Sequence, residues 1–401
     1  MMMNGAYTAP AEVGLFQKRT LIVGVVFLVL LAVGAFLNRQ QFFHSYLVAY
    51  LFWVGIALGS LALLMLQHLT GGHWGLVIRR VLEAATRTLP LLALLFIPII
   101  IGAHDIYPWT HQEEMSKTPA LAQKARIYLN LPGFVGRAIL YFALWGVLAY
   151  LLNKWSWEQD RTADKRYTKR LGKLSGPGII IFVLTVTFAS VDWAMSLNPE
   201  WFSTIYGFLF VAAWVLSALA FAILMMAVIG RREPLARVVR PNHFQDLGKL
   251  MLALVMLWAY FSFSQFLIVW SGNLPEEIQW YLPRVNGVWG AIALSVVIFH
   301  FALPFILLLS RSLKRNAGKL MILAIVILVI RLIDFFWMVA PEFSHGGFHV
   351  SWMDVAAPIG LGGVWLAMFF WQLSKRQLVA INDPQYERLL AEAEAPVHAD
   401  H

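Results

Sequence analysis

The chain has 401 residues, of which 60% are hydrophobic and only 13% charged, and it carries a formal net charge of +9. This composition excludes an ordinary soluble domain, where about a quarter of residues are charged. The basic residues fall in short segments between apolar runs, where topology signals are expected, so the charge does not indicate nucleic-acid binding. The sequence contains no cysteine, which excludes disulfides, thiolate-bound iron–sulfur clusters and cysteine zinc sites on this chain.

Ten apolar runs are long enough to cross a bilayer as helices of about 20 residues. The first follows a polar segment, residues 1–19, and lacks a small-residue cleavage site, so we expect an uncleaved first span. The third is the least regular, because charged residues occupy its first turns. The predicted spans are about 20–37, 42–69, 80–103, 133–153, 177–197, 203–230, 247–272, 285–311, 318–340 and 354–375.

The distribution of Lys and Arg predicts the orientation of these spans. Alternate connections and both terminal segments hold 23 of these residues, against five on the opposite side. Since cytoplasmic loops carry the excess, both termini are expected in the cytoplasm. The most basic connection, residues 154–173, is either a lipid or partner patch or, as we interpret it, a solvated turn with a topology signal. The outer connection 104–132 is long enough to fold over the bundle or to dock a partner.

An internal repeat links two helix ends. Asp192-Trp193 precedes Pro199-Glu200-Trp201 with the same spacing that separates Asp334-Phe335 from Pro341-Glu342-Phe343. Four spans lie between the two copies, which predicts two parallel four-helix bundles, spans 2–5 and 6–9, flanked by spans 1 and 10. Seven helical residues would place each aspartate about 10 Å below its helix exit. The predicted divisions are 1–41, 42–200, 201–343, 344–376 and a cytoplasmic tail, 377–401.

Ionisable residues inside apolar spans are costly and commonly handle protons or hold ion pairs. Arg331 and Asp334 are three residues apart and are expected to pair, either as a packing device or as a tuned protonatable carboxylate. Asp192 needs a partner from another span, and Arg137 and His44 are nearest by depth. The proton-transfer candidates are Glu83, Arg87, Asp192, His300, Arg331 and Asp334.

Three of these candidates have plainer interpretations. Glu83 and Arg87 share a helix face, so they form either an inner proton entry or an interfacial turn with snorkelling side chains. His300, alone in mid-span, is either a hydrogen-bonded core residue or part of a polar track with span 7. The histidines His44, His68 and His300 lie at different predicted depths, so no haem is expected. The outer connection lacks compact metal-ligand spacing, so no metal is expected either.

Three stretches together indicate a family. They are Gly102 to Glu114 (GAHDIYPWTHQEE), Ser190 to Gly207 (SVDWAMSLNPEWFSTIYG), and Leu247 to Glu277 with its FSQF and WSGNLPEE segments. From about residue 40 to 375, the chain resembles the ActF-type subunits of bacterial alternative complex III, a quinol:cytochrome c oxidoreductase. These belong to the wider NrfD-like family of polysulfide-reductase-type membrane subunits.

The resemblance implies an all-α, polytopic subunit of the bacterial cytoplasmic membrane that binds quinone without a redox cofactor of its own. Its implied partners are a paralogous NrfD-like subunit, a periplasmic iron–sulfur protein and cytochrome c subunits, which receive the electrons of quinol. The family places quinone in the first bundle, which gives the candidates His44, His104, Asp105, Arg137 and Asp192, and proton translocation is a further expectation. An autonomous ion or solute transporter and a purely structural anchor remain the alternatives.

Overall fold

The structure is a computed structural model that describes residues 10–344 and 347–386. Its regular structure in these residues is entirely helical, and ten helical segments are long and apolar enough to cross a membrane. By this criterion the chain is a multi-pass, all-helical membrane protein, as predicted. The tail sequence from Tyr386 to Glu394 suggests a short helix, but all of it except Tyr386 lies outside the described residues.

Seven spans are single helices and three are composite. The single ones are α1 (Ala11–Leu37), α2 (Arg39–Thr70), α9 (Leu131–Thr162), α11 (Tyr206–Ile229), α12 (Pro241–Gly272), α18 (Ala317–Phe343) and α19 (Trp352–Ser374). Span 3 is α3 (His73–Thr86), α4 (Leu89–Leu95) and α5 (Ile97–Ile101), span 5 is α10 (Arg166–Trp193) with η3 (Met195–Leu197), and span 8 is α15 (Gly287–Val296), the π-helix η5 (Val297–Ala302) and α16 (Leu303–Leu309).

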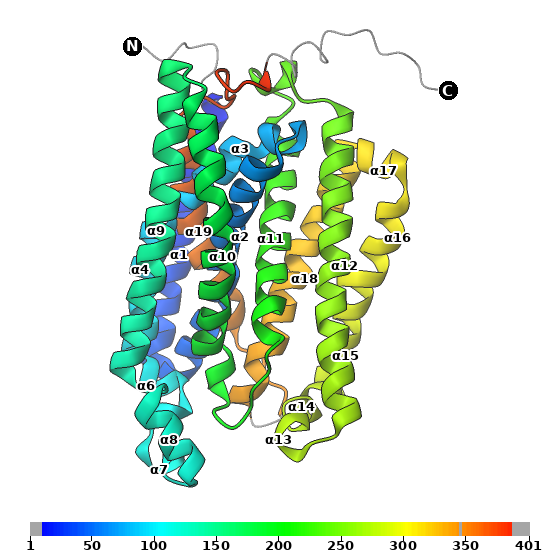
Figure 1. The fold of residues 1–401 in the computed structure, drawn as a ribbon. Helices are drawn as coiled ribbons and strands as arrows, with labels where there is room; N and C mark the ends of the chain where they lie inside the picture. The colour runs from blue at the N-terminus through cyan, green and yellow to red at the C-terminus, as the bar shows by residue number, and fades with distance from the viewer. Residues whose placement is uncertain (1–9, 345–346, 387–401) are drawn as a thin grey trace.

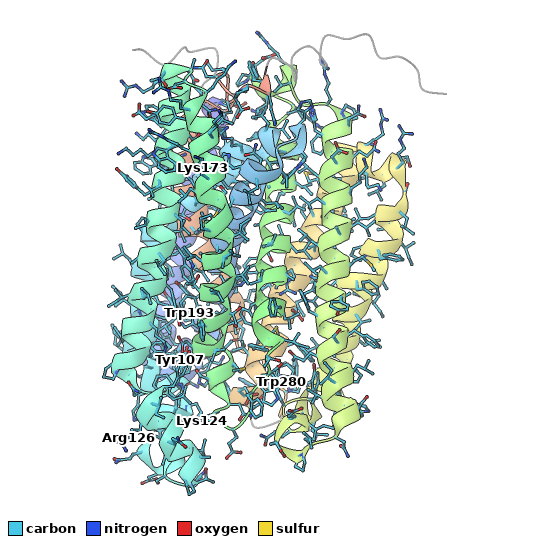
Figure 2. The ribbon with its side chains drawn as sticks, viewed as in Figure 1. Tyr107, Lys124, Arg126, Lys173, Trp193 and Trp280 are labelled. Carbon is cyan, nitrogen blue, oxygen red and sulfur yellow. The ribbon has the colours of Figure 1, made fainter. Side chains whose placement is uncertain are left out.

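Short helices cover the two ends of the bundle (Figure 1). We call the end with α6 (Ala103–Ile106), η2 (Pro108–Thr110), α7 (Gln112–Met115), α8 (Pro119–Ile127), α13 (Pro275–Ile278) and α14 (Leu282–Val285) the distal end. The opposite, basic end carries η4 (Leu235–Arg237), α17 (Arg311–Arg315) and the α9–α10 connection. Lys173 lies toward the basic end, and Lys124 and Arg126 lie at the distal end (Figure 2).

Helices α2 and α11 form the centre of the molecule. They pack directly on one another, α2 also contacts α3, α10, α18 and α19, and α11 contacts α12 and α18. The close approach requires small residues: a Cβ at Gly59 would lie 2.0 Å from the carbonyl oxygen of Trp214. Membrane helices commonly associate through such small-residue contacts.

One prediction about a connection is wrong, and span 3, expected to be the least regular, is divided into separate helices. The segment 154–173 is not a long solvated turn, because α9 continues to Thr162 and α10 begins at Arg166. Span 3 is not one straight helix, because α3 ends at Thr86 and a new helix begins at Leu89, immediately before Pro90. Proline has no N–H to continue the helical hydrogen-bond pattern and clashes with the preceding turn.

The beginning of the predicted tail also differs from expectation. Residues 377–386 do not extend away from the helices, since Leu378, Val379 and Ala380 are buried. Asp383 forms a 2.7 Å ion pair with Arg79, which is fully buried. The tail therefore contributes a charged group to the interior of the basic end.

Candidate functional site

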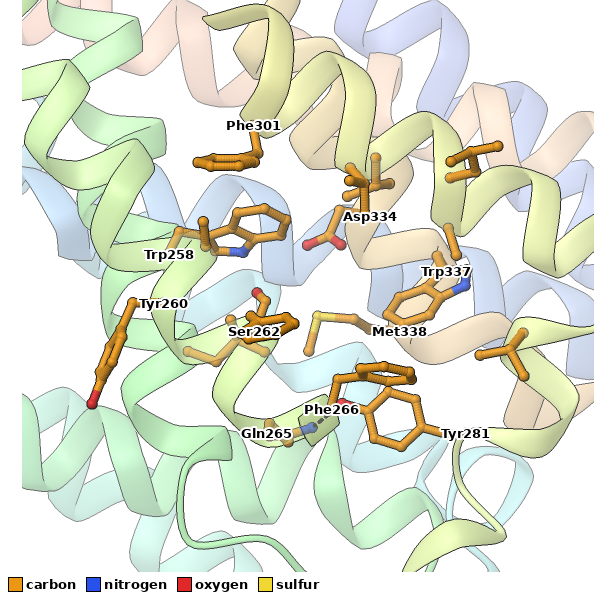
Figure 3. A pocket seen from close by; sticks show the side chains of 18 of the residues that line it. Trp258, Tyr260, Ser262, Gln265, Phe266, Tyr281, Phe301, Asp334, Trp337 and Met338 are labelled. Carbon is orange, nitrogen blue, oxygen red and sulfur yellow. Dashed lines mark hydrogen bonds between the residues drawn. The ribbon is translucent and has the colours of Figure 1, made fainter. Parts of the chain in front are cut away.

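A cavity of about 750 Å³ lies between α12, α15, η5 and α18, with Asp334 and Trp337 in its lining (Figure 3). Trp280 and Tyr281, from the segment before α14 at the distal end, also line it. Its walls are almost entirely apolar and aromatic. Tyr260, Phe263 and Leu294 line the cavity and are also exposed on the surface of the helices, so the cavity opens sideways toward the membrane. This form suits a lipophilic molecule arriving from the bilayer.

A few polar groups face this cavity from three elements. Ser262 and Gln265 come from α12, Asp334 from α18, and Tyr281 from the segment before α14. Gln265 donates a hydrogen bond to the Tyr281 hydroxyl at 3.3 Å and accepts one from Ser203 at 3.2 Å. Burial raises the pKa of Tyr281 to about 12, so its hydroxyl stays protonated and is able to donate.

The predicted pair of Arg331 and Asp334 is confirmed. Arg331 Nη1 lies 2.8 Å from Asp334 Oδ2, and the two side chains are 0% and 3% exposed. The contact is short but poorly aligned for a hydrogen bond, and within the described residues none of the guanidinium nitrogens has an aligned partner. The Arg331 guanidinium also lies 4.9 Å from the Phe335 ring centre. Such a pair is costly to bury, because full desolvation is only partly offset by attraction.

His300 lies beside this pair, within the π-helical turn η5. Its ring centre is 4.0 Å from that of Trp258, and Trp258 also lies 5.7 Å from the Arg331 guanidinium. The interpretation of His300 as a hydrogen-bonded core residue is wrong, because neither ring nitrogen has a hydrogen-bond partner in the part of the chain described. Single π-helical turns are frequent at functional sites, since they re-aim one side chain.

Asp192 pairs with Arg137, one of the two partners predicted for it. Arg137 donates from Nε and Nη2 to both carboxylate oxygens at 2.8–3.1 Å, and Tyr141 donates to Oδ2 at 2.8 Å. The guanidinium also stacks 3.8 Å from the ring centre of Tyr128. This carboxylate is therefore fully hydrogen-bonded, unlike that of Asp334.

The repeated motif forms two different helix ends. Helix α18 continues through Pro341 to Phe343, whereas α10 ends at Trp193, directly after its aspartate. The Ser196 hydroxyl donates to the Asp192 carbonyl at 2.6 Å and accepts from the Trp109 indole, which holds the chain in the 3₁₀ turn η3. The prediction that both aspartates lie seven helical residues below an exit is therefore wrong for Asp192.

The remaining quinone candidates lie at the distal end and contact different partners. His44 contacts the carbonyl oxygen of Asp105 at 3.1 Å and stacks on Phe343, while the Asp105 carboxylate pairs with Arg39 at 2.9 Å. His104 instead contacts His111 at 3.2 Å. The structure therefore joins Arg137 with Asp192, and His44 with Asp105, but none of the five quinone candidates lines the 750 Å³ cavity.

Glu83 lies at the basic end in a buried network. Its carboxylate accepts from Arg79 at 3.0 Å, Arg80 at 2.7 Å and Ser156 at 2.6 Å. Snorkelling is therefore the wrong description of this turn, because Glu83 and both arginines are buried. Arg87 does not pair with the Glu83 carboxylate, although it shares the helix face, and donates to the Glu83 and Gln372 carbonyl oxygens instead.

Arg284 was not predicted as a functional residue, because its place between two spans made it one of the loop charges. It is fully buried and donates to the carbonyl oxygens of Trp280 and Met338 and to the Glu342 carboxylate at 2.7–2.8 Å. Burial lowers the pKa of Arg284, and Glu342 opposes that shift. The contacts tie the α14 segment, which closes the cavity, to the end of α18. The sequence signal was Glu342, the carboxylate of the Pro-Glu motif in the second copy of the repeat, which lies 58 residues from Arg284 along the chain.

No family model matches the chain, and no curated protein matches it as a relative. The geometry of the cavity and of the buried charges therefore provides the structural basis for a functional proposal.

Proposed function

We propose that this protein is a membrane subunit of a quinol:electron-acceptor oxidoreductase of the alternative complex III type. The sequence resemblance to NrfD-like subunits supports this assignment. The packing supports the finer architecture as well: spans 2–5 pack among themselves, as do spans 6–9, so we infer two four-helix bundles flanked by α1 and α19. The basic end, with its excess of Lys and Arg, would face the cytoplasm.

The observation that carries the proposal is the cavity beside Asp334. A quinol has a polar ring and an apolar tail, and the cavity offers aromatic walls, a lateral opening, the hydroxyls of Ser262 and Tyr281, an amide and a carboxylate. Quinol oxidation releases two electrons and two protons. The Asp334 carboxylate is placed to take up one proton at the ring, and His300 and Arg331 extend the polar track away from the cavity.

The electrons must leave through other chains, because this one has no cysteine to hold an iron–sulfur cluster. We propose that iron–sulfur and haem c subunits dock at the distal end and accept them, beside a paralogous membrane subunit. Asp192 and the Glu83 and Arg87 turn remain candidates for proton transfer in the first half. The pair of Arg137 and Asp192, with His44, His104 and Asp105, remains the alternative quinone location.

A cavity-filling variant tests this proposal. Ala293 lines the cavity, so Ala293→Phe should weaken binding of a photoreactive quinone to the purified protein in nanodiscs at least tenfold. Ala291→Phe is the matched control, because Ala291 lies on the same helix but is exposed and does not line the cavity. If Asp192→Asn weakens quinone labelling and Ala293→Phe does not, the quinone site lies in the first half of the chain. Absence of specific labelling would refute quinone binding.

A further inference from the structure

A second recess lies at the basic end and is chemically unlike the cavity. It has a volume of about 510 Å³ and lies between the α3–α4 junction, α9 and α19. Four cationic residues line it, Arg87, Lys154, Lys375 and Arg376, and among residues 10–344 and 347–386 no aspartate or glutamate does so. The interruption of span 3 at Arg87 and Thr88 forms one wall, so the recess depends on the break before Pro90.

The two arginines are oriented mainly by backbone oxygens. Arg87 Nη2 donates to the Gln372 carbonyl at 2.8 Å, and Arg376 Nη1 donates to the Asn153 carbonyl at 3.0 Å. The nearest carboxylate to Arg376 is Glu83 at 3.7 Å, but Glu83 already pairs with two other arginines. These carbonyls fix the guanidinium groups without neutralising them.

The charges of this region do not balance. Glu83, Asp160 and Asp383 are the carboxylates of the adjoining network, where they pair with Arg79 and Arg80. With the four cations of the recess, the described part of the chain places six positive charges against three negative ones in the recess and the adjoining network. An anionic ligand in the recess would relieve this excess in a partly desolvated place.

The recess lies where a bilayer surface is expected. Helix α19 has 23 residues and ends at Ser374, so its length of about 35 Å is close to the hydrocarbon thickness and places Lys375 and Arg376 at the boundary. Trp157 lies 5.2 Å from the Arg376 guanidinium, and Tyr150 lies 5.8 Å from Lys154 Nζ. Aromatic side chains are enriched at this level of membrane proteins.

The recess continues from charged to apolar surface. Leu89, Pro90, Gly146 and Ala149 line the part on α4 and α9. A Cβ at Gly146 would meet no atom within 4 Å, so the groove is open along α9. A ligand that fits both parts needs an anionic head and a hydrocarbon chain.

We propose that this recess binds the phosphate headgroup of an anionic phospholipid, with an acyl chain along α4 and α9. Arginine forks bind phosphate oxygens with two parallel hydrogen bonds, and the lysines add charge at the rim. Basic pockets between membrane helices commonly hold anionic headgroups. The proposal does not depend on quinol chemistry.

Lipid titration of the delipidated protein, followed by native mass spectrometry, tests this site. Lys154 and Lys375 are exposed, so Lys154→Gln/Lys375→Gln should fold normally and bind phosphatidylglycerol at least tenfold more weakly, and adding Arg87→Gln should abolish saturable binding. Binding of phosphatidylcholine should not change. Lys165→Gln/Lys169→Gln is the matched control, with the same charge change at exposed positions of the basic end.

Two results would overturn the proposal. An equal loss in the control would show general attraction to a positive surface. Inorganic phosphate that displaces the lipid completely, and binds alone with the same dependence on the three residues, would show a site for soluble phosphate. Loss confined to the recess variants, with little competition by free phosphate, is the expected result.

Discussion

The buried pair of Arg331 and Asp334 allows a quantitative test of how charge is held inside this bundle. At 2.8 Å and an effective dielectric constant near 20, the two charges attract by about 6 kcal/mol, which offsets only part of the cost of desolvating both of them. Removing one partner leaves the other buried and uncompensated. We therefore expect Asp334→Leu or Arg331→Met to lower the free energy of unfolding by about 3–5 kcal/mol.

The double variant should be much less damaging than the sum of the two single variants. Replacing both charges by apolar groups removes the attraction and the desolvation cost together, so we expect it to lie within about 2 kcal/mol of the wild type. Denaturant titration in detergent micelles, followed by tryptophan fluorescence, measures all four free energies, and their cycle gives the coupling.

The exposed pair of Asp246 and Lys249 is the control. It has the same spacing and the same 2.8 Å distance, but its side chains are 45% and 56% exposed. The corresponding cycle should give a coupling below about 0.5 kcal/mol. If the losses of unfolding free energy at Arg331 and Asp334 are additive, with no more coupling than in the control, burial does not couple the two charges.

Two further predictions concern the cavity and its proton acceptor. Arg284→Met removes the hydrogen bonds that hold the α14 segment to α18. We therefore expect faster proteolysis between residues 273 and 286 and at least fivefold weaker quinone labelling. If neither the proteolysis rate nor the labelling changes, Arg284 has no role in closing the cavity. Asp334→Asn keeps an oxygen beside Arg331 but cannot take up a proton, so we expect an assembled complex with at least tenfold slower quinol oxidation. Full turnover in the assembled complex would exclude Asp334 as the proton acceptor.

Local spacing predicted part of this structure well. The ten spans follow from apolar length, and the pair of Arg331 and Asp334 follows from helical geometry, because residues three apart share a face. The partner of Asp192 was one of two candidates, Arg137 and His44, because depth in the membrane limits which cation is able to reach it. Each of these inferences needs only the spacing of residues along one helix or the depth of a residue in the bilayer.

Other features depend on contacts that sequence spacing does not encode. The ion pair between Arg79 and Asp383 joins residues 304 positions apart, and it forms because the tail folds back onto α3. The break before Pro90 was not predicted, although proline gives a local signal for it. The burial of Arg284 and the cavity beside Asp334 depend on how α12, α15 and α18 are spaced, which no single segment determines.

The composition of the complex that copurifies with this protein tests the functional proposal most directly. The membrane should be solubilised in mild detergent, the affinity-purified complex identified by mass spectrometry, and its visible spectrum recorded before and after reduction by a quinol. We expect a second NrfD-like subunit, an iron–sulfur protein and c-type haem that the quinol reduces. A stable, active protein that purifies alone, without haem or iron–sulfur partners, would contradict it.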